Sequence, residues 1–479
     1  MSTDGAVRVS AADQRQRVAQ AFLIAAGAAA GVAVALAVLL ADNRIVIAVA
    51  VILAGLVVGL WRPFVAVLLY VAIAIIRPDE LRLLPVFLHL ERISAIFCVA
   101  ALMLPQIARH TWQPWRWQRS DWSLIALLAA ACWAVPASVS RPWALNGVYE
   151  VAKLGFLYAV VRYASTSVPR LRAIVWVMLL ATAFAAVMSL HGLVEGRVYI
   201  GEHGVLRALG PTSTTGFGDP DVLGNSLVAM LPFALLLIAP QVGALPKLVH
   251  LSLIPLFLYA VALTGTRTAA VSMAAVVVVI IAQSRRRFLS LGLAAIAASL
   301  LWSVTPQDLR ERYMTLRSYR EEATYQGRVN NVRLACQMLR DRPATGCGVT
   351  CFRIARVEEY DGQWSDAHNL FGQVGSESGV PGLAAFTFFL VATFTSAWRA
   401  RRTLRQLGAG AGPDYVWLAR MSAAAIIMFI ALLVQGLGSH NFLGWQFYVG
   451  SALIANSLML ARDELSARSG GPQPAASAS

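Results

Sequence analysis

With 479 residues, of which 58% are hydrophobic and only 14% charged, the chain is too apolar to fold as a soluble globule. Soluble domains carry roughly a quarter charged residues. A formal charge of +15 would suit a nucleic-acid-binding protein, but the arginines stand in short clusters between apolar runs, as in the cytoplasmic loops of membrane proteins. The composition indicates an all-α polytopic membrane protein in contact with membrane lipids and excludes nucleic acid as a partner.

The chain opens with a polar segment, residues 1–20, and continues into an apolar run over 21–40 that is long enough to span a bilayer. No signal-peptide cleavage site follows, so we expect this run to remain as the first span. About fourteen apolar runs of spanning length are present, near 21–40, 45–60, 64–76, 93–108, 122–138, 148–161, 171–191, 222–239, 248–264, 268–283, 287–303, 379–397, 416–435 and 443–460.

The arginine clusters fall in alternate connections if the N-terminus is cytoplasmic, and this alternation predicts the orientation. The predicted organisation is a cytoplasmic tail (1–20), transmembrane helices (21–304), a long periplasmic catalytic loop (305–378), C-terminal transmembrane helices (379–461) and a disordered cytoplasmic tail (462–479). Cys336, Cys347 and Cys351 lie in the long loop, where a disulfide is possible if the loop faces an oxidising compartment.

Four basic residues in or beside the apolar runs are candidate functional groups. Lys153 interrupts the run 148–161, with Glu150 one turn before it, and a functional role and a simple ion pair are equally open. Arg207, Arg267 and Arg328 fall in connections on the predicted outer side, against the general trend of the arginines. Each arginine alone is best explained as an ordinary surface residue. The three together with a histidine favour an anion site, since guanidinium groups bind phosphates bidentately.

That histidine is His368, at the end of the long polar loop. We expect Ser365 or Asp366 to cap a helix that starts at Ala367, which would place His368 and Gly379 on one helix face, about three turns apart. A histidine in the first turn of a helix has a lowered pKa and stays neutral, as a general base must. From its position alone, a loop histidine bound to a backbone carbonyl is the more frequent alternative.

Three further residues are possible supports of such a site. Glu377 could orient His368 or a substrate, although a solvated carboxylate is the slightly better interpretation. His440 is a second candidate base in the last outer turn, and Asn369 follows the histidine directly. Phosphate-binding glycine loops and zinc motifs are absent from the sequence, and we expect no metal, no cofactor and no soluble nucleotide sugar.

The segment after His368 resembles the signature of the O-antigen ligase and polymerase superfamily, a histidine followed by Asn, Ser or Gln and, at fixed spacing, by a glycine and then Gly, Thr or Tyr. His368, Asn369, Gly379 and Gly382 occupy these positions. Three other stretches resemble the family in the same order, and the likeness extends over roughly 195–460. They are Arg207 with Gly210-Pro211 and Asn225 to Pro232, then Leu263 to Arg267, then Gly327-Arg328 with the run from Arg342 to Gly348.

The resemblance implies a GT-C-type glycosyltransferase with about 12–14 transmembrane helices in the bacterial inner membrane, with its site facing the periplasm. The donor would be a glycan on undecaprenyl pyrophosphate and the acceptor a sugar hydroxyl of lipid A–core. In this scheme Arg207, Arg267 and Arg328 hold the pyrophosphate and His368 accepts the proton of the attacking hydroxyl, in a metal-independent, inverting displacement.

Several alternatives stay open at this stage. Relatives act as polysaccharide polymerases or as protein O-glycosylation ligases, and the sequence does not choose among these acceptors. A lipid-linked oligosaccharide transporter would need polar residues near the bilayer midplane, where only Glu150 and Lys153 stand. A structural partner of a glycan export complex would not need His368.

Overall fold

The structure is a computed structural model that describes residues 55, 57–59, 61–78, 89–108, 110–201, 204–211, 218–238, 243–315, 323–408 and 412–469. Two compact units are formed, one by residues 1–73 with 78–111 and the other by 74–77 with 112–479. The predicted span 21–40, most of the predicted span 45–60 and the tail 1–20 lie outside the described residues.

Helices form nearly all of the regular structure, because apolar runs in a bilayer must satisfy every backbone hydrogen bond internally. Seven of the described helices are long and apolar enough to cross a membrane, and three shorter ones are also apolar. This all-α polytopic architecture confirms the predicted fold class, and every predicted run from 64–76 onward coincides with a helix. The elements are α3 (Pro63–Ile76), α4 (Leu90–Ala108), α5 (Arg119–Ala134), α6 (Arg141–Ala164), α7 (Val168–Val194), β1 (Val198–Ile200), β2 (Leu206–Ala208), α8 (Pro220–Leu236), α9 (Ala244–Thr264), α10 (Arg267–Gln283), α11 (Arg287–Val304), α12 (Gln307–Met314), α13 (Ala323–Asp341), α14 (Phe352–Glu359), α15 (Leu370–Gln406), α16 (Pro413–Gly436) and α17 (Trp445–Arg468).

In the first unit, α4 buries one narrow stripe. Leu90, Ser94, Cys98 and Ala101 are its buried residues, and their spacing of three or four residues places them on a single helix face.

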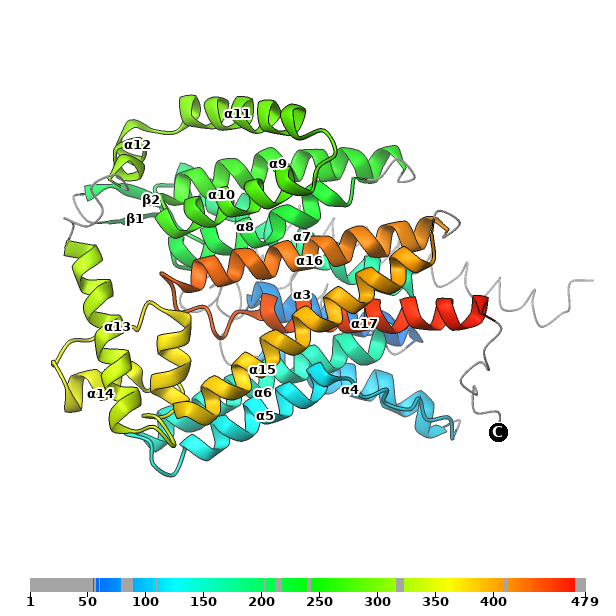
Figure 1. The fold of residues 1–479 in the computed structure, drawn as a ribbon, viewed down its shortest axis with the longest axis horizontal. Helices are drawn as coiled ribbons and strands as arrows, with labels where there is room; N and C mark the ends of the chain where they lie inside the picture. The colour runs from blue at the N-terminus through cyan, green and yellow to red at the C-terminus, as the bar shows by residue number, and fades with distance from the viewer. Residues whose placement is uncertain are drawn as a thin grey trace, which may run out of the picture. The chain divides into compact units, whose positions relative to one another are not determined.

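In the second unit, α15, α16 and α17 pack on one another at the centre. Helices α8 and α10 pack on α16, whereas α5 packs on α15 and α6 on α17 (Figure 1). Phe386, Phe389, Phe429 and Phe447 are fully buried between the three central helices, and their rings contact one another edge to face or stacked. Close aromatic packing of this kind gives the unit a rigid centre.

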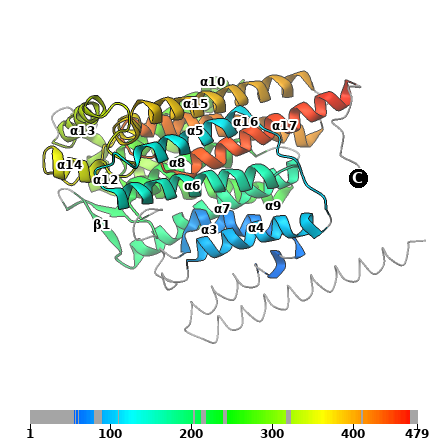
Figure 2. The same ribbon diagram turned by 90° about the horizontal axis from the view of Figure 1, so that it is seen from below.

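The short elements gather at one end of the second unit. The hairpin of β1 and β2 lies there with α12, α13 and α14, at the left of Figure 1 and again at the left in the view from below (Figure 2). The two strands pair antiparallel, with Tyr199 opposite Arg207. In its described residues, the predicted long loop 305–378 therefore contains the three helices α12, α13 and α14 and the start of α15.

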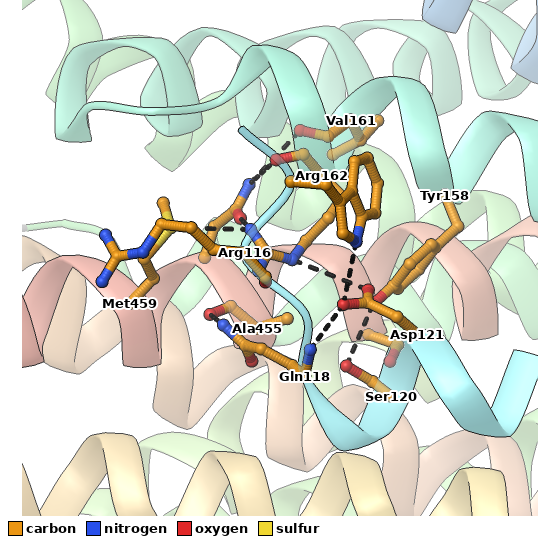
Figure 3. A network of polar contacts seen from close by, with 12 residues as sticks. Arg116, Gln118, Ser120, Asp121, Tyr158, Val161, Arg162, Ala455 and Met459 are labelled. Atoms are coloured by element: carbon orange, nitrogen blue, oxygen red, sulfur yellow. Dashed lines mark hydrogen bonds and ion pairs between the residues drawn. The ribbon is translucent and has the colours of Figure 1, made fainter. Parts of the chain in front are cut away.

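A buried polar network joins α5, α6 and α17 at the opposite end of α6 (Figure 3). The Tyr158 hydroxyl donates to Asp121 Oδ1 (2.6 Å), and Arg162 donates to Asn456 Oδ1 (2.6 Å) and to the Arg116 carbonyl (2.7 Å). Arg162 also lies 3.8 Å from Asp121. These hydrogen bonds and the ion pair between buried charges tie the three helices together.

The C-terminal tail corrects one prediction. Residues 462–468, predicted as disordered, continue α17. Arg116 and Asp463 form a bidentate ion pair at 2.6 and 2.8 Å, and Arg468 donates to Glu464 one turn earlier. These pairs extend the helix beyond its apolar part.

Candidate active site

His368 lies just before α15, in a turn and not in the first helical turn. The cap of α15 is Asn369, whose Oδ1 accepts from the Gly372 amide at 2.8 Å. The prediction that Ser365 or Asp366 caps a helix from Ala367 is therefore wrong, and Asp366 is engaged in ion pairs. His368 has φ of +48°, a left-handed backbone that is uncommon for a residue other than glycine and is often found at functional sites.

Helix α15 also departs from the predicted continuous helix after three turns. Gly379 has φ of 66° and ψ of −167°, so the helix kinks there. A Cβ at Gly379 would lie 2.6 Å from the Pro343 carbonyl oxygen, so only glycine fits. His368 precedes the helix and Gly379 is the kink residue itself, so the expected shared helix face is not formed.

An acidic and a second basic side chain surround His368. The rings of His368 and His440 meet edge to face, with centroids 5.3 Å apart. His440 Nε2 lies 3.2 Å from Asp366 Oδ2, and Arg353 forms a two-pronged ion pair with the same carboxylate. Asn331 on α13 donates to the Asp366 carbonyl at 2.9 Å, which fixes the turn that carries these groups.

The surroundings keep His368 neutral. Burial lowers its pKa to about 4, the positive charges of His440 and Arg328 act in the same direction, and Asp366 and Asp221 oppose them. Burial by itself would raise the pKa of Asp366, but the hydrogen bonds from Arg353 and the charge of His440 outweigh it and lower that pKa. The predicted downward shift of the His368 pKa is thus confirmed, although burial and not the helix dipole is its main cause.

Arg207, on β2, donates to protein acceptors from its Nε and Nη2 atoms. Its Nε donates to the Thr264 carbonyl at 2.6 Å, and its Nη2 donates to Asp221 and to Thr266 Oγ1. The guanidinium also lies over the Tyr199 ring, 5.5 Å from its centroid. These contacts hold the hairpin onto the turn between α9 and α10.

Two more arginines border the same turn. Arg267, the first residue of α10, is buried and donates to Thr315 Oγ1 at 2.9 Å. Arg312 of α12 donates to the Gly265 carbonyl at 2.9 Å, where Gly265 ends α9 in a left-handed conformation. The turn is thus enclosed by guanidinium groups from three elements.

Arg328, on α13, connects this turn with His368. A Cβ at Gly438 would lie 3.0 Å from Arg328 Nη1 and 2.9 Å from Thr268 Cγ2. Gly438, Thr268 and the Arg328 guanidinium therefore meet in one place. Since Thr268 follows Arg267 and Gly438 precedes His440 by two residues, Arg328 stands between the arginine-rich turn and the two histidines.

The remaining predicted supports fall elsewhere. Glu377 is buried, its backbone carbonyl accepts from Gly348 at 2.9 Å, and its Oε2 has no partner among the described residues. Lys153 pairs with Glu150 at 2.7 Å, and Arg77 lies 3.8 Å from the same carboxylate. The structure shows the ion pair at Lys153 that the sequence left open. All five cysteines are free thiols, so the long loop contains no disulfide.

Sequence reasoning missed the partners of the histidines and of the turn. Asp366 was considered only as a cap, and Arg353, Asp221 and Arg312 were not singled out. The one available signal was the spacing of Asp366 and His368, which lie two residues apart in a polar loop. The other partners lie on separate elements, where spacing along the chain carries no information.

Two regions of the chain match the models of known protein families. Residues 252–387 match the model of a family described as O-Antigen ligase, and residues 44–240 match the model of a family of unknown function. No curated protein matches the chain. The first region carries Arg267, Arg328 and His368, and the second carries Arg207 and Asp221. The site thus combines residues of both regions, and His440 lies beyond them.

Proposed function

Since residues 252–387 match the model of a family described as O-Antigen ligase, we propose that this chain is a glycosyltransferase-type membrane enzyme of that superfamily, with a GT-C-type fold. It would move a glycan from undecaprenyl pyrophosphate to a sugar hydroxyl of lipid A–core on the periplasmic side of the inner membrane. The observation that carries this proposal is the position of Arg328. Its guanidinium meets Gly438 and Thr268, between a neutral histidine and an arginine-rich turn.

The arginines would act on the leaving group. Arg267 and Arg328 are assigned to the pyrophosphate, whose negative charge grows as the bond to the sugar breaks, and fixed positive charges stabilise such a transition state. Arg207 is assigned a different role from the one predicted, because its Nε and Nη2 donate to Asp221 and the turn 264–266. It would hold the turn that presents Arg267.

The histidines would act on the acceptor. His368 is neutral and can take the proton of the acceptor hydroxyl as that oxygen attacks the anomeric carbon. Asp366 and Arg353 would hold His440 against the His368 ring and so fix its orientation. One displacement with the pyrophosphate leaving from the opposite face inverts the anomeric configuration.

The alternatives differ mainly in the acceptor. A polymerase would use a second lipid-linked glycan, and a protein O-glycosylation ligase a serine or threonine hydroxyl, with the same groups around His368. For a lipid-linked oligosaccharide transporter, the charges inside the described spans give little support. Lys153 is paired with Glu150 and Arg162 with Asp121, so neither marks an open polar path.

A transfer assay in liposomes tests the proposal. The purified protein would receive the lipid-linked glycan of its source strain together with lipid A–core, a second lipid-linked glycan or a periplasmic protein extract. Transfer to lipid A–core is expected, and it should disappear in His368→Ala. His191→Ala is the matched control, because the His191 side chain is 56% exposed and paired only near the surface. Transfer by wild type to none of the acceptors would refute an enzymatic role.

A further inference from the structure

Two exposed tryptophans form an open corner beside the His368 turn. Trp143, in the first turn of α6, and Trp364, between α14 and α15, meet edge to face, with centroids 6.4 Å apart and ring planes at 75°. Trp364 is 57% exposed and Trp143 is 48% exposed. The guanidinium carbon of Arg353 lies 5.9 Å from the centroid of the Trp364 ring. The corner therefore presents aromatic surface with a charged hydrogen-bond donor at its side.

The corner is held rigidly. The Thr350 hydroxyl donates to the Trp143 carbonyl at 3.0 Å, and the Cys351 thiol donates to the Ser140 carbonyl at 3.5 Å. The Val139 amide donates to the Cys347 carbonyl at 3.0 Å. Thr350 adopts a φ of 65°, which is strained for a β-branched residue and persists only where the surroundings enforce it. The start of α6 is thus fixed to the segment that leads into α14.

The corner also joins the proposed reaction site directly. Arg353, which lies over Trp364, forms the ion pair with Asp366, and Asp366 contacts His440. Trp364 precedes Asp366 by two residues. A ligand on the corner would therefore lie next to a ligand at His368.

Tryptophans at a membrane interface are the ordinary explanation for exposed indoles, and Trp398, on the apolar helix α15, fits it. Trp364 does not. It lies in a polar segment in which Asp361, Gly362 and Gln363 are also exposed, and such a segment is a poor site for lipid tails. A polar ligand with an apolar face suits this place better.

A sugar ring has that character. The C–H groups on one face of a pyranose meet the negative face of an aromatic ring, while its hydroxyls accept from charged donors such as a guanidinium. The geometry points to a glycan-binding platform made of Trp143, Trp364 and Arg353, which holds a sugar ring of a substrate glycan near the reacting sugar. This inference rests on the proposed function. Both the donor chain and the acceptor core are glycans, and the experiment separates them.

The test compares Trp364→Leu and Trp143→Leu with wild type in the liposome transfer assay, with donor and acceptor varied in turn. Loss of one ring contact, about 0.5–1.5 kcal/mol, should raise the KM of the bound glycan about 2- to 13-fold, with kcat little changed. Trp364→Phe keeps a ring and should retain most of the affinity. The matched control is Trp398→Leu, because Trp398 is 61% exposed and carries Arg402 at 5.7 Å from its ring centroid.

Calorimetric titration with two free glycans gives a second readout that does not need turnover. One is released from the lipid-linked donor by mild acid, and the other is the core oligosaccharide. If the leucine variants raise KM and Kd for the donor glycan alone, the platform binds the donor. If they raise both constants for the core oligosaccharide alone, the platform binds the acceptor. Unchanged KM and Kd for both in Trp364→Leu and Trp143→Leu, with an active wild type, would overturn the platform and leave the proposed function standing. A wild type that transfers no glycan would overturn both. If the leucine variants do not fold, as size-exclusion chromatography would show, Trp364→Gln, which also removes the ring at this exposed position, decides by the same two measurements.

Discussion

The low pKa of His368 leads to a pH dependence that an ordinary histidine would not give. His368 must be neutral to accept a proton, so lowering the pH removes activity only as the imidazole becomes charged. Burial holds its pKa at about 4, below the usual value of about 6.5. We therefore expect the transfer rate to stay nearly constant from pH 9 down to pH 5.

A lowered and an ordinary pKa of His368 predict very different transfer rates at pH 5. With a pKa of about 4, about nine-tenths of His368 is still neutral at pH 5, so the rate should be about nine-tenths of that at pH 7. With an unperturbed pKa of about 6.5, the rate at pH 5 would be about one twenty-fifth of that at pH 7. His368→Ala should lower the rate at every pH by about 10²- to 10⁴-fold, or about 2.7–5.4 kcal/mol in barrier.

The assay measures initial transfer rates with saturating donor and acceptor at pH 5, 6, 7, 8 and 9, for wild type, His368→Ala and His440→Asn. Donor affinity, which depends on the arginines, should be unchanged in His368→Ala. The assignment of His368 as the base would be refuted if the wild-type rate fell with a midpoint near pH 6.5 and this fall persisted in His368→Ala but disappeared in His440→Asn. His440 would then be the base. Retention of more than about a tenth of the rate by His368→Ala would reduce His368 to a positioning residue.

Three further predictions test the remaining parts of the site. Arg267→Lys and Arg328→Lys should each lose most transfer activity while the protein still inserts, because an ammonium cannot reproduce a bidentate guanidinium contact. Arg420→Lys, whose arginine donates to the Ile238 carbonyl far from the site, is the control, and near-normal rates in both site variants would argue against phosphate contact. Transfer should survive EDTA, and a loss of activity that Mg²⁺ or Mn²⁺ restores would show a metal requirement. Gly379→Ala should lower the melting temperature, because its Cβ would lie 2.6 Å from the Pro343 carbonyl oxygen at a φ of 66°, a strain of about 1–3 kcal/mol. A melting temperature equal to that of wild type would contradict the rigid kink.

The helices could be predicted from the sequence because a bilayer leaves an apolar run no other way to pair its backbone groups. Runs such as 171–191 and 416–435 coincide with α7 and α16 for this reason. The boundaries were less secure where polar residues continue a helix. The last turns of α17 depend on side-chain pairs such as Arg468 with Glu464, and the start of α15 depends on the Asn369 cap.

The sequence by itself determined that the protein is a helical membrane protein and that His368, Arg267 and Arg328 are residues to examine, because residue type and local pattern carry that information. Only the tertiary structure decided what each of them contacts. Asp366 holds His440 against His368. Arg207 donates hydrogen bonds to Asp221 and to the Thr264 carbonyl, and the ring of Trp143 contacts that of Trp364. These partners come from separate elements, and the packing of the helices, which no local pattern along the chain encodes, brings them together.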